Sequence, residues 1–390
     1  NYPVYDAFIE LCRKADAKYN SGLFHFTEEK DISLSADTLT PGLHVDDGKL
    51  KKIIDGLYYP DCPYEFSMIS TEILGNIYEQ FLGKVIRLTD AHQAKVEDKP
   101  EVKKAGGVFY TPQYIVNYIV ENTVGELLKG KTPNKVSKLR IVDPACGSGS
   151  LLLKVEKILG KDSVQNGFFG QEINITTYNL CRINMFLHDI GFDKFNIACE
   201  DTLINPQHWD NEPFELIVSN PPYSIKWAGD DNPLLINDMR FSPAGVLAPK
   251  SKADMAFIMH ALSWLAPNGT AAIVCFPGIM YRGGAEQKIR KYLVDNNFID
   301  CVVQLPSNLF FGTSIATCVM VMKRNKADNK ILFIDASNQC VKVTNNNKLL
   351  PEHIDAIVNA FAKREDVQYF CRLADYDEIK EQNYNLSVST

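Results

Sequence analysis

The chain has 390 residues, of which 45% are hydrophobic and 23% charged, and this composition is typical of a globular protein with room for two or three domains. Its formal net charge of -7 argues against a protein that holds nucleic acid through bulk electrostatic attraction alone. The longest apolar runs are far too short for a membrane helix, so we expect no membrane span.

The N-terminal part of the chain predicts helices. Asn1-Tyr2-Pro3 shows neither an initiator Met nor a signal pattern, so we expect the natural chain to be longer. Residues 1–88 have helical periodicity, clearest over 69–82, and predict a small helical domain. Residues 89–106 are polar and rich in Lys and Glu, and predict an exposed linker. In the following G-G-V-F-Y-T-P-Q segment, Thr111 and Pro112 predict a helix start, whose free N–H groups suit an anion.

From residue 138 to residue 323, short apolar runs alternate with longer amphipathic segments. This rhythm is typical of βαβ units, and predicts an α/β fold with a doubly wound sheet. The expected strands are 139–142, 167–170, 196–199, 215–218, 271–276, 299–305 and 317–322. Residues 224–252 interrupt the rhythm with a polar stretch, and a loop of that length is usually functional or disordered. We therefore expect a catalytic domain over 107–323 and a C-terminal extension over 324–390 that docks a partner.

Residues 139–153 read as a strand, a glycine turn and a helix, with the motif D-P-A-C-G-S-G at 143–149. Glycines let the backbone approach a ligand closely, and Asp143 ends its strand where doubly wound sheets bind ligands. The third glycine of the dinucleotide fingerprint is missing, so the turn suits a cofactor without a pyrophosphate. Two acids follow the next two strands: Glu172 is placed for a ribose diol and Asp201 for an adenine amino group. Either acid alone would read as a solvated residue at a strand end.

A further strand ends in Asn220-Pro221-Pro222-Tyr223. Prolines stop a strand because they lack an N–H, and this alone would explain them. They also stiffen the turn and present the Asn220 side-chain oxygen and the Pro221 carbonyl oxygen as two convergent acceptors. Two acceptors on one planar amino group favour a pyramidal nitrogen, whose lone pair can then attack a methyl group. The motif therefore predicts a catalytic site, with Tyr223 stacked on a base flipped out of a duplex.

With these three motifs together, the chain resembles the methyltransferases that modify the adenine amino group in DNA. Residues 253–260, 277–286 and 305–313, the 74–82 segment and Tyr384-Asn385-Leu386 are similar to the modification subunit of type I restriction-modification systems. The resemblance covers nearly the whole chain. It implies a Rossmann-like methyltransferase domain that uses S-adenosylmethionine to methylate N6 of adenine in double-stranded DNA, with separate specificity and restriction subunits as partners.

The resemblance also implies the site residues. The cofactor-binding residues are expected to be Phe109, Tyr110, Thr111, Pro112, Gln113, Asp143, Pro144, Gly147, Ser148, Gly149, Glu172, Asp201 and Asn220. The catalytic residues are expected to be Asn220, Pro221, Pro222 and Tyr223, with Phe310 or Phe311 as a second aromatic on the flipped base. A core aromatic at a strand end would explain Phe310 or Phe311 equally well. Many type I subunits carry Phe at the position of Tyr223, and either ring can stack.

The remaining chemistry-bearing residues predict no further centre. The ten cysteines form no C-x-x-C pair and fit small buried hydrophobes in a reducing cytoplasm, where we expect the protein to reside. His188, His208 and His260 lack metal-ligand spacing, so we predict no metal site. No P-loop and no nuclease carboxylate cluster is recognisable, so DNA cleavage would need another polypeptide or a missing segment.

Three alternative functions stay open from the residues alone. The same catalytic motif serves methyltransferases of protein glutamine or of RNA bases, although the F-Y-T-P segment and the N-terminal helical region favour DNA. A non-enzymatic scaffold that binds S-adenosylmethionine conflicts with the intact Asn220 and Tyr223. The chain could also be the methyltransferase domain of a fused single-chain restriction-modification enzyme. No target-reading domain is apparent, so we expect sequence specificity to come from a separate subunit or an absent domain.

Overall fold

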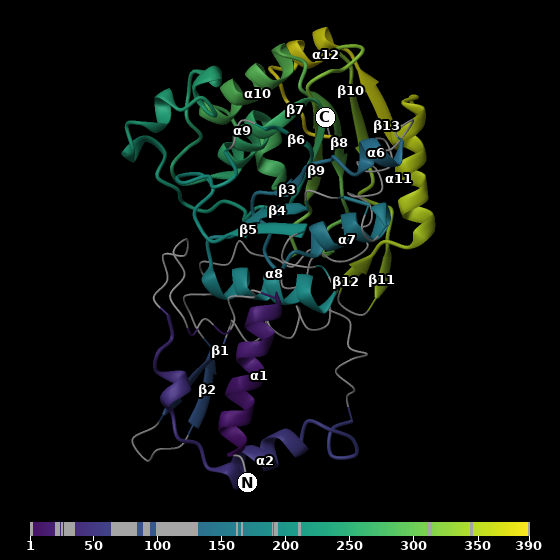
Figure 1. Cartoon of the computed structure of the whole chain (residues 1–390). Helices are drawn as coiled ribbons and strands as arrows, with labels where there is room; N and C mark the ends of the chain where they lie inside the picture. Colours follow the sequence, from purple (N-terminus) through teal and green to yellow (C-terminus); the bar gives the residue numbers. More distant parts are fainter. Residues whose placement is uncertain are drawn as a thin grey trace.

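A computed structural model shows how the chain folds (Figure 1). It describes residues 3–19, 24, 26, 36–63, 84–88, 94–98, 132–160, 163–164, 167–188, 190, 194–209, 212–309, 314–343 and 346–388. The predictions for 69–82, for Phe109 to Gln113, and for Phe310 and Phe311 lie outside these residues.

The described residues of the N-terminal region include the helices α1 (Val4–Tyr19) and α2 (Asp47–Asp55) and the short 3₁₀ helix η1 (Thr40–Gly42). Asp46 caps α2, since its side chain accepts from the backbone N–H of Lys49 at 2.9 Å. The Val4 N–H donates to Asp47 at 2.9 Å and joins the two helices.

A short antiparallel hairpin follows, formed by β1 (Lys84–Leu88) and β2 (Ala94–Asp98). β2 lies inside the stretch 89–106 that we expected to be a linker, so this part is a strand rather than a loop. Pairing with β1 satisfies the backbone groups on one edge of β2.

The main body is built on one nine-stranded sheet in the order β13-β10-β8-β9-β7-β6-β3-β4-β5. Its strands are β3 (Ile141–Asp143), β4 (Phe168–Gln171), β5 (Phe195–Ala198), β6 (Phe214–Ser219), β7 (Leu265–Cys275), β8 (Ile299–Gln304), β9 (Cys318–Lys323), β10 (Ile331–Asp335) and β13 (Cys371–Ala374). All run parallel except β9, which lies antiparallel between β7 and β8, and the edge strand β13. The seven strands expected from the sequence are all present, and the predicted α/β fold is confirmed.

The strand order reverses between β3 and β6. From β3 the chain continues outward to β4 and β5, and then returns to place β6 on the other side of β3. Ligands of open α/β sheets bind in the crevice beyond the carboxyl ends of the strands at such a reversal. The two segments that leave these strands are the glycine motif after β3 and the Asn-Pro-Pro-Tyr motif after β6.

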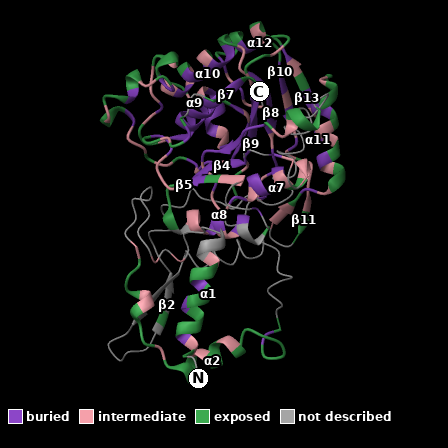
Figure 2. Ribbon diagram, in the orientation of Figure 1, coloured by how far each residue is buried: buried purple, intermediate pink, exposed green. Residues whose placement is uncertain are grey.

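Helices cover both faces of the sheet (Figure 1). One core contains side chains of α7 (Ser150–Leu159), α8 (Ile175–Leu187) and α11 (Pro351–Lys363). The other contains side chains of α9 (Asp254–Trp264), α10 (Ala285–Asp295) and α12 (Tyr376–Glu381). Strand residues alternate between these cores: in β9, Val319 and Val321 face the first, while Met320 and Met322 face the second. Both faces are therefore buried, as parallel strands require (Figure 2).

The remaining described elements are short. They are α6 (Pro133–Val136), the hairpin of β11 (Val341–Val343) and β12 (Asn346–Lys348), and the 3₁₀ helices η4 (Gly229–Asp231), η5 (Leu235–Asn237), η6 (Ser242–Ala244) and η7 (Pro277–Met280). Three of them, η4 to η6, lie in the predicted long loop. That loop is closed at its base by hydrogen bonds from Trp227 N to Lys250 O and from Ala253 N to Ile225 O, at 3.0 and 2.9 Å.

The C-terminal part continues the main sheet. Residue 323, the expected end of the catalytic domain, is the last residue of β9, and β10 and β13 follow within the same sheet. The buried guanidinium of Arg290 donates to the Tyr384 and Ile279 carbonyls at 2.9 and 2.8 Å, and Leu386 N donates to Met280 O at 2.9 Å. These bonds fasten the C-terminal segment to the body. Within the described residues, no helix has the length and apolar character of a membrane span.

Candidate active site

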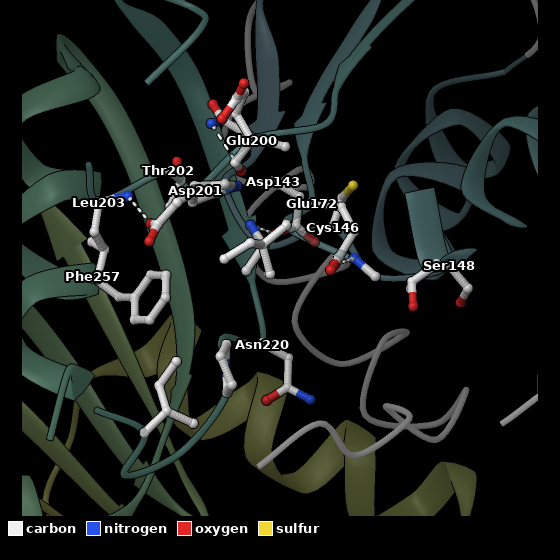
Figure 3. Close-up of a pocket in the computed structure, with 18 of the residues that line it drawn as sticks. Asp143, Cys146, Ser148, Glu172, Glu200, Asp201, Thr202, Leu203, Asn220 and Phe257 are labelled. Carbon is white, nitrogen blue, oxygen red and sulfur yellow. Dashed lines mark hydrogen bonds between the residues drawn. The ribbon is translucent and has the colours of Figure 1, made fainter. Parts of the chain in front are cut away.

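A cavity of about 200 Å³ opens at the carboxyl ends of β3, β4, β5 and β6 (Figure 3). Its described lining consists of residues 143–148, 150–151, 171–173, 200–203, 220, 222 and 225–227, with Thr177, Leu180 and Phe257. The cavity therefore lies at the reversal of strand order. It brings together the predicted residues Asp143, Pro144, Gly147, Ser148, Glu172, Asp201, Asn220 and Pro222.

The glycine turn forms one wall of the cavity. Gly147 and Gly149 have φ of 54° and 83°, in the left-handed region that glycine adopts at low cost. A Cβ on Gly149 would also lie 2.8 Å from the Cys181 sulfur of α8, so the position is closed to larger residues. The turn is fixed from α8, because the Asn184 side chain donates to the Ser148 carbonyl at 2.9 Å. Gly149 itself is the N-cap of α7 and does not line the cavity.

Glu172 links the second strand end to the glycine turn. Its Oε2 accepts from Gly147 N at 3.1 Å and its Oε1 from Asn174 N at 2.8 Å. Burial raises the pKa of this carboxyl above its ordinary value, although the backbone hydrogen bonds oppose the shift. The side chain thus shapes the turn and also lines the cavity.

Asp143 and Asp201 line the same cavity with different partners. Asp143 is almost fully buried, and its Oδ1 accepts from Ala145 N at 3.0 Å and from the Ser219 hydroxyl at 2.7 Å. Burial raises its pKa to about 7, and the nearby charge of Glu172 adds to the shift. Asp201 accepts from Leu203 N at 2.9 Å, and this bond fixes the turn that continues the wall (Figure 3).

Two of the four residues of the Asn-Pro-Pro-Tyr motif, Asn220 and Pro222, line the cavity. Figure 3 shows Asn220 below Asp201 and Glu172 in that view. Tyr223 is 8% exposed and lines a second, small cavity with Pro221 and Pro222. Its hydroxyl donates to the Asn220 side-chain oxygen at 2.5 Å. Burial raises the pKa of Tyr223 well above its ordinary value, so the hydroxyl keeps its proton and is the donor.

Asp254, the first residue of α9, holds the chain just after this motif. Both of its carboxylate oxygens accept from Ser224 N, each at 3.1 Å. Ser224 has a φ of 52°, unusual for a residue with a side chain, and needs such support. Burial raises the pKa of Asp254, while the bond from Ser224 lowers it.

Sequence reasoning did not single out Asp254, Gln171 or Arg240 for this site. Gln171 is fully buried, and its amide donates to the carbonyls of Glu200 and Asn205 at 3.1 and 2.9 Å, so it supports the Asp201 segment. Each of the three side chains binds a segment distant in sequence. For Asp254 a signal was available, because it is an acid within the apolar segment 253–260.

The described residues contain no group of three or more His, Cys, Asp or Glu side chains that could hold a metal ion. The predicted absence of a metal site stays a prediction.

Comparison with known proteins gives consistent matches. The model of the N-6 DNA methylase family matches residues 69–390. The methylase subunit of a type I restriction enzyme of Mycoplasma pneumoniae is 44% identical over 369 residues, which are 92% of this chain and 64% of that protein. Another such subunit, of Methanocaldococcus jannaschii, is 32% identical over 337 residues, 83% of this chain and 54% of the relative.

A solved structure agrees with these relatives. The methyltransferase subunit of a type I restriction-modification system from Streptococcus thermophilus superposes with a TM-score of 0.68 at 35% identity, and the match covers 83% of this chain and 65% of that one. The chain thus spans from about half to about two thirds of the length of the proteins it matches.

Proposed function

The chain belongs to the N-6 DNA methylase family, and from this premise we propose that it transfers a methyl group from S-adenosylmethionine to the N6 amino group of adenine in double-stranded DNA. The observation that carries the proposal is the single cavity on which Asp143, Glu172, Asp201 and Asn220 converge. The proposed catalytic unit includes residues 107–323 and the strands β10 and β13, which complete its sheet.

The charge of the cavity fits this cofactor. Four acidic residues line it, Asp143, Glu172, Glu200 and Asp201, against one lysine, Lys226. Such a lining would repel a pyrophosphate, whereas a sulfonium and an ammonium group are attracted to it. Leu180, Leu203 and Phe257 add apolar surface for a flat ring.

Each acid has a proposed role in holding the cofactor. Glu172 accepts from the ribose hydroxyls, and Asp201 accepts from the adenine amino group. The glycine turn, including Pro144, Gly147, Ser148 and Gly149, allows close approach of the backbone. The same proposal includes Phe109, Tyr110, Thr111, Pro112 and Gln113, which lie outside the described residues. When bound, the cofactor supplies an electrophilic methyl group on a positively charged sulfur.

Asn220 and Pro221 would act on the substrate base. The Asn220 side-chain oxygen and the Pro221 carbonyl accept the two amino hydrogens of a flipped adenine, which concentrates the lone pair on N6 toward the methyl group. As the new bond between N6 and the methyl carbon forms, the methyl–sulfur bond would break and release S-adenosylhomocysteine as a neutral thioether, and the surplus proton on N6 would leave to solvent. Tyr223 orients the Asn220 amide through its hydrogen bond, and we propose Tyr223 with Phe310 or Phe311 as the aromatics that contact the base.

The names of the relatives support a proposal about partners. The Mycoplasma pneumoniae and Streptococcus thermophilus proteins are named as subunits of type I restriction systems. We propose that this chain likewise works with a specificity subunit and a restriction subunit, and that residues 1–88 and 324–390 provide docking surfaces. In the N-terminal region, the side chains of Leu39, Ile53 and Tyr59 are exposed and apolar enough for such contacts.

Calorimetry with S-adenosylmethionine and the variant Glu172→Ala tests the cofactor site. The chain should bind the cofactor, and the variant should lose on the order of 1 to 3 kcal/mol of binding free energy with the ribose hydrogen bonds. Glu172→Gln keeps one acceptor and should lie between the two, and Glu352→Ala, an exposed acid of α11, is the control. Equal affinity of wild type and Glu172→Ala would remove Glu172 from the site.

A further inference from the structure

The loop that follows the catalytic motif, residues 224–252, carries a buried arginine. Arg240 is 3% exposed, and its guanidinium uses every N–H it has. Asp238 accepts from Nε at 3.0 Å and from the Nη2 group at 2.7 Å. The Nη1 group donates to the Thr202 carbonyl at 2.9 Å, and the Nη2 group to the Leu203 carbonyl at 2.7 Å.

The fifth N–H reaches His260 of α9, whose Nδ1 lies 3.1 Å from Nη1 of Arg240. Because arginine only donates, Nδ1 is the acceptor and Nε2 carries the ring proton, which faces the Thr202 hydroxyl at 3.3 Å. Burial lowers the pKa of His260 well below its ordinary value, and the charges of Arg240 and His208 act in the same direction. The neutral ring thus accepts from Arg240 at neutral pH and holds Thr202 from the other side.

The two carbonyls that Arg240 binds belong to the wall of the cavity. Thr202 and Leu203 line it directly after Asp201, whose carboxylate accepts from Leu203 N. Fixing the carbonyls of 202 and 203 fixes the peptide that donates to Asp201, and so sets the direction of that carboxylate. Gln171 holds the same segment on its other side, through the carbonyls of Glu200 and Asn205.

We propose that Arg240 is a positioning residue that couples the loop 224–252 to the cofactor-binding wall at Asp201–Leu203, so that cofactor affinity and the packing of this loop depend on each other. The inference rests on the proposed function, since it takes the cavity as the S-adenosylmethionine site. Arg240 is not among the residues that line the cavity. Its guanidinium reaches the wall of the cavity through the carbonyls of Thr202 and Leu203.

Arg240→Lys is the test, because lysine keeps the charge but has three donors in place of five fixed ones. The Kd for S-adenosylmethionine should rise about tenfold, while kcat at saturating cofactor should stay within about threefold of wild type. The matched control is Arg140→Lys, at the residue just before β3, which does not line the cavity. Arg140 is also buried, pairs with Glu212 at 2.7 Å and stacks 4.7 Å from a phenylalanine ring, as Arg240 does on Phe241.

A second readout follows from the reciprocity of coupled equilibria. S-adenosylmethionine should slow trypsin cleavage at Lys250, an exposed site of the loop, in the wild type and in Arg140→Lys, but not in Arg240→Lys. Asp238→Ala, which removes the outer partner of the guanidinium, replaces Arg240→Lys if that variant does not fold.

Three results are decisive. Weaker cofactor binding in Arg240→Lys than in Arg140→Lys, with loss of protection, supports the proposal. If the two variants bind the cofactor equally well, with or without a fall in Tm, Arg240 has a purely structural role and the proposal is overturned. Failure of the wild type to bind S-adenosylmethionine would overturn the proposed function, and the inference with it.

Discussion

The hydrogen bond from the Tyr223 hydroxyl to the Asn220 side-chain oxygen, 2.5 Å long, fixes the amide before any substrate arrives. An oriented acceptor at a reacting atom contributes more than one that must reorganise. Asn220→Ala should therefore reduce methylation by at least about 100-fold. Cofactor affinity should change far less, because Asn220 is one of many residues around the cavity. Single-turnover methylation and calorimetry measure the two quantities separately.

Tyr223→Phe is the companion variant, because it removes the donor and keeps the ring. The amide of Asn220 stays in place as an acceptor, so activity should fall by less than about tenfold. Near-normal turnover of Asn220→Ala would contradict the role given to the amide.

The pKa of Asp143 has a consequence for stability. Its value is about 7 in the folded protein against 3.8 ordinarily, because the side chain is buried. At a pH between these two pKa values, the Asp143 carboxyl is protonated in the folded state and ionised in the unfolded state. The contribution of Asp143 to the free energy of unfolding therefore decreases as pH rises from about 4 to 7. Asp143→Asn keeps an oxygen for Ala145 N and the Ser219 hydroxyl but removes the charge.

Cofactor-free Asp143→Asn should thus gain on the order of 1 kcal/mol of unfolding free energy at pH 8 relative to wild type, and little or nothing near pH 4. Chemical denaturation at several pH values checks this. Glu172, whose pKa burial also raises, is retained in both proteins, and only its repulsion by the Asp143 charge differs between them. If the unfolding free energies of the two proteins change with pH in parallel, Asp143 is not the group that causes this pH dependence.

At the scale of elements, α9 holds the end of the Asn-Pro-Pro-Tyr motif through its first residue. Asp254 at the helix N-terminus benefits from the free N–H groups there while it grips Ser224 N with both oxygens. Asp254→Ala releases the residue after Tyr223, so kcat should fall about tenfold or more while the Kd for S-adenosylmethionine changes less than about threefold. Asp254→Asn keeps one acceptor and should be milder. A change confined to Kd would assign Asp254 to the cofactor instead.

The strands and their order of appearance were predictable because each is an apolar run bounded by polar turns. β6, for example, was expected at 215–218 and spans Phe214–Ser219. The residues at strand ends were predictable too, since parallel strands bring their carboxyl ends to one edge. Asp143, Glu172, Asp201 and Asn220 accordingly line one cavity.

The supports of that cavity were not predictable from local patterns. Arg240 binds backbone carbonyls that are 37 and 38 residues away, and Asp254 binds a backbone N–H that is 30 residues away. Neither periodicity nor motif spacing encodes such pairs. β10 and β13 were also not assigned to the sheet, because short strands after residue 323 give a weak signal and their pairing is set by the sheet they join. The burial of Tyr223 likewise depends on α9 and β7 behind it.

At the scale of the whole molecule, the net charge of -7 bears on how a DNA site is found. Reading a specific sequence takes side chains fitted to base edges and cationic phosphate contacts, and the chain is acidic overall. We predict that this chain alone does not select one sequence, and that adding a specificity subunit confers selectivity. Methylation of duplexes that differ at single positions, with and without the partner, tests this. Selective methylation by the isolated chain would exclude the need for a partner.

Among the described residues, the two outermost strands of the main sheet are β5 and β13, which have four residues each. An edge that short offers few unpaired backbone groups to another extended chain, so it is a poor template for cross-β growth. The sheet should resist lengthening by strand addition, whether from a misfolded copy or from a partner. Association with other subunits is then left to side-chain surfaces on helices and loops, where a single substitution can weaken binding without unravelling the sheet.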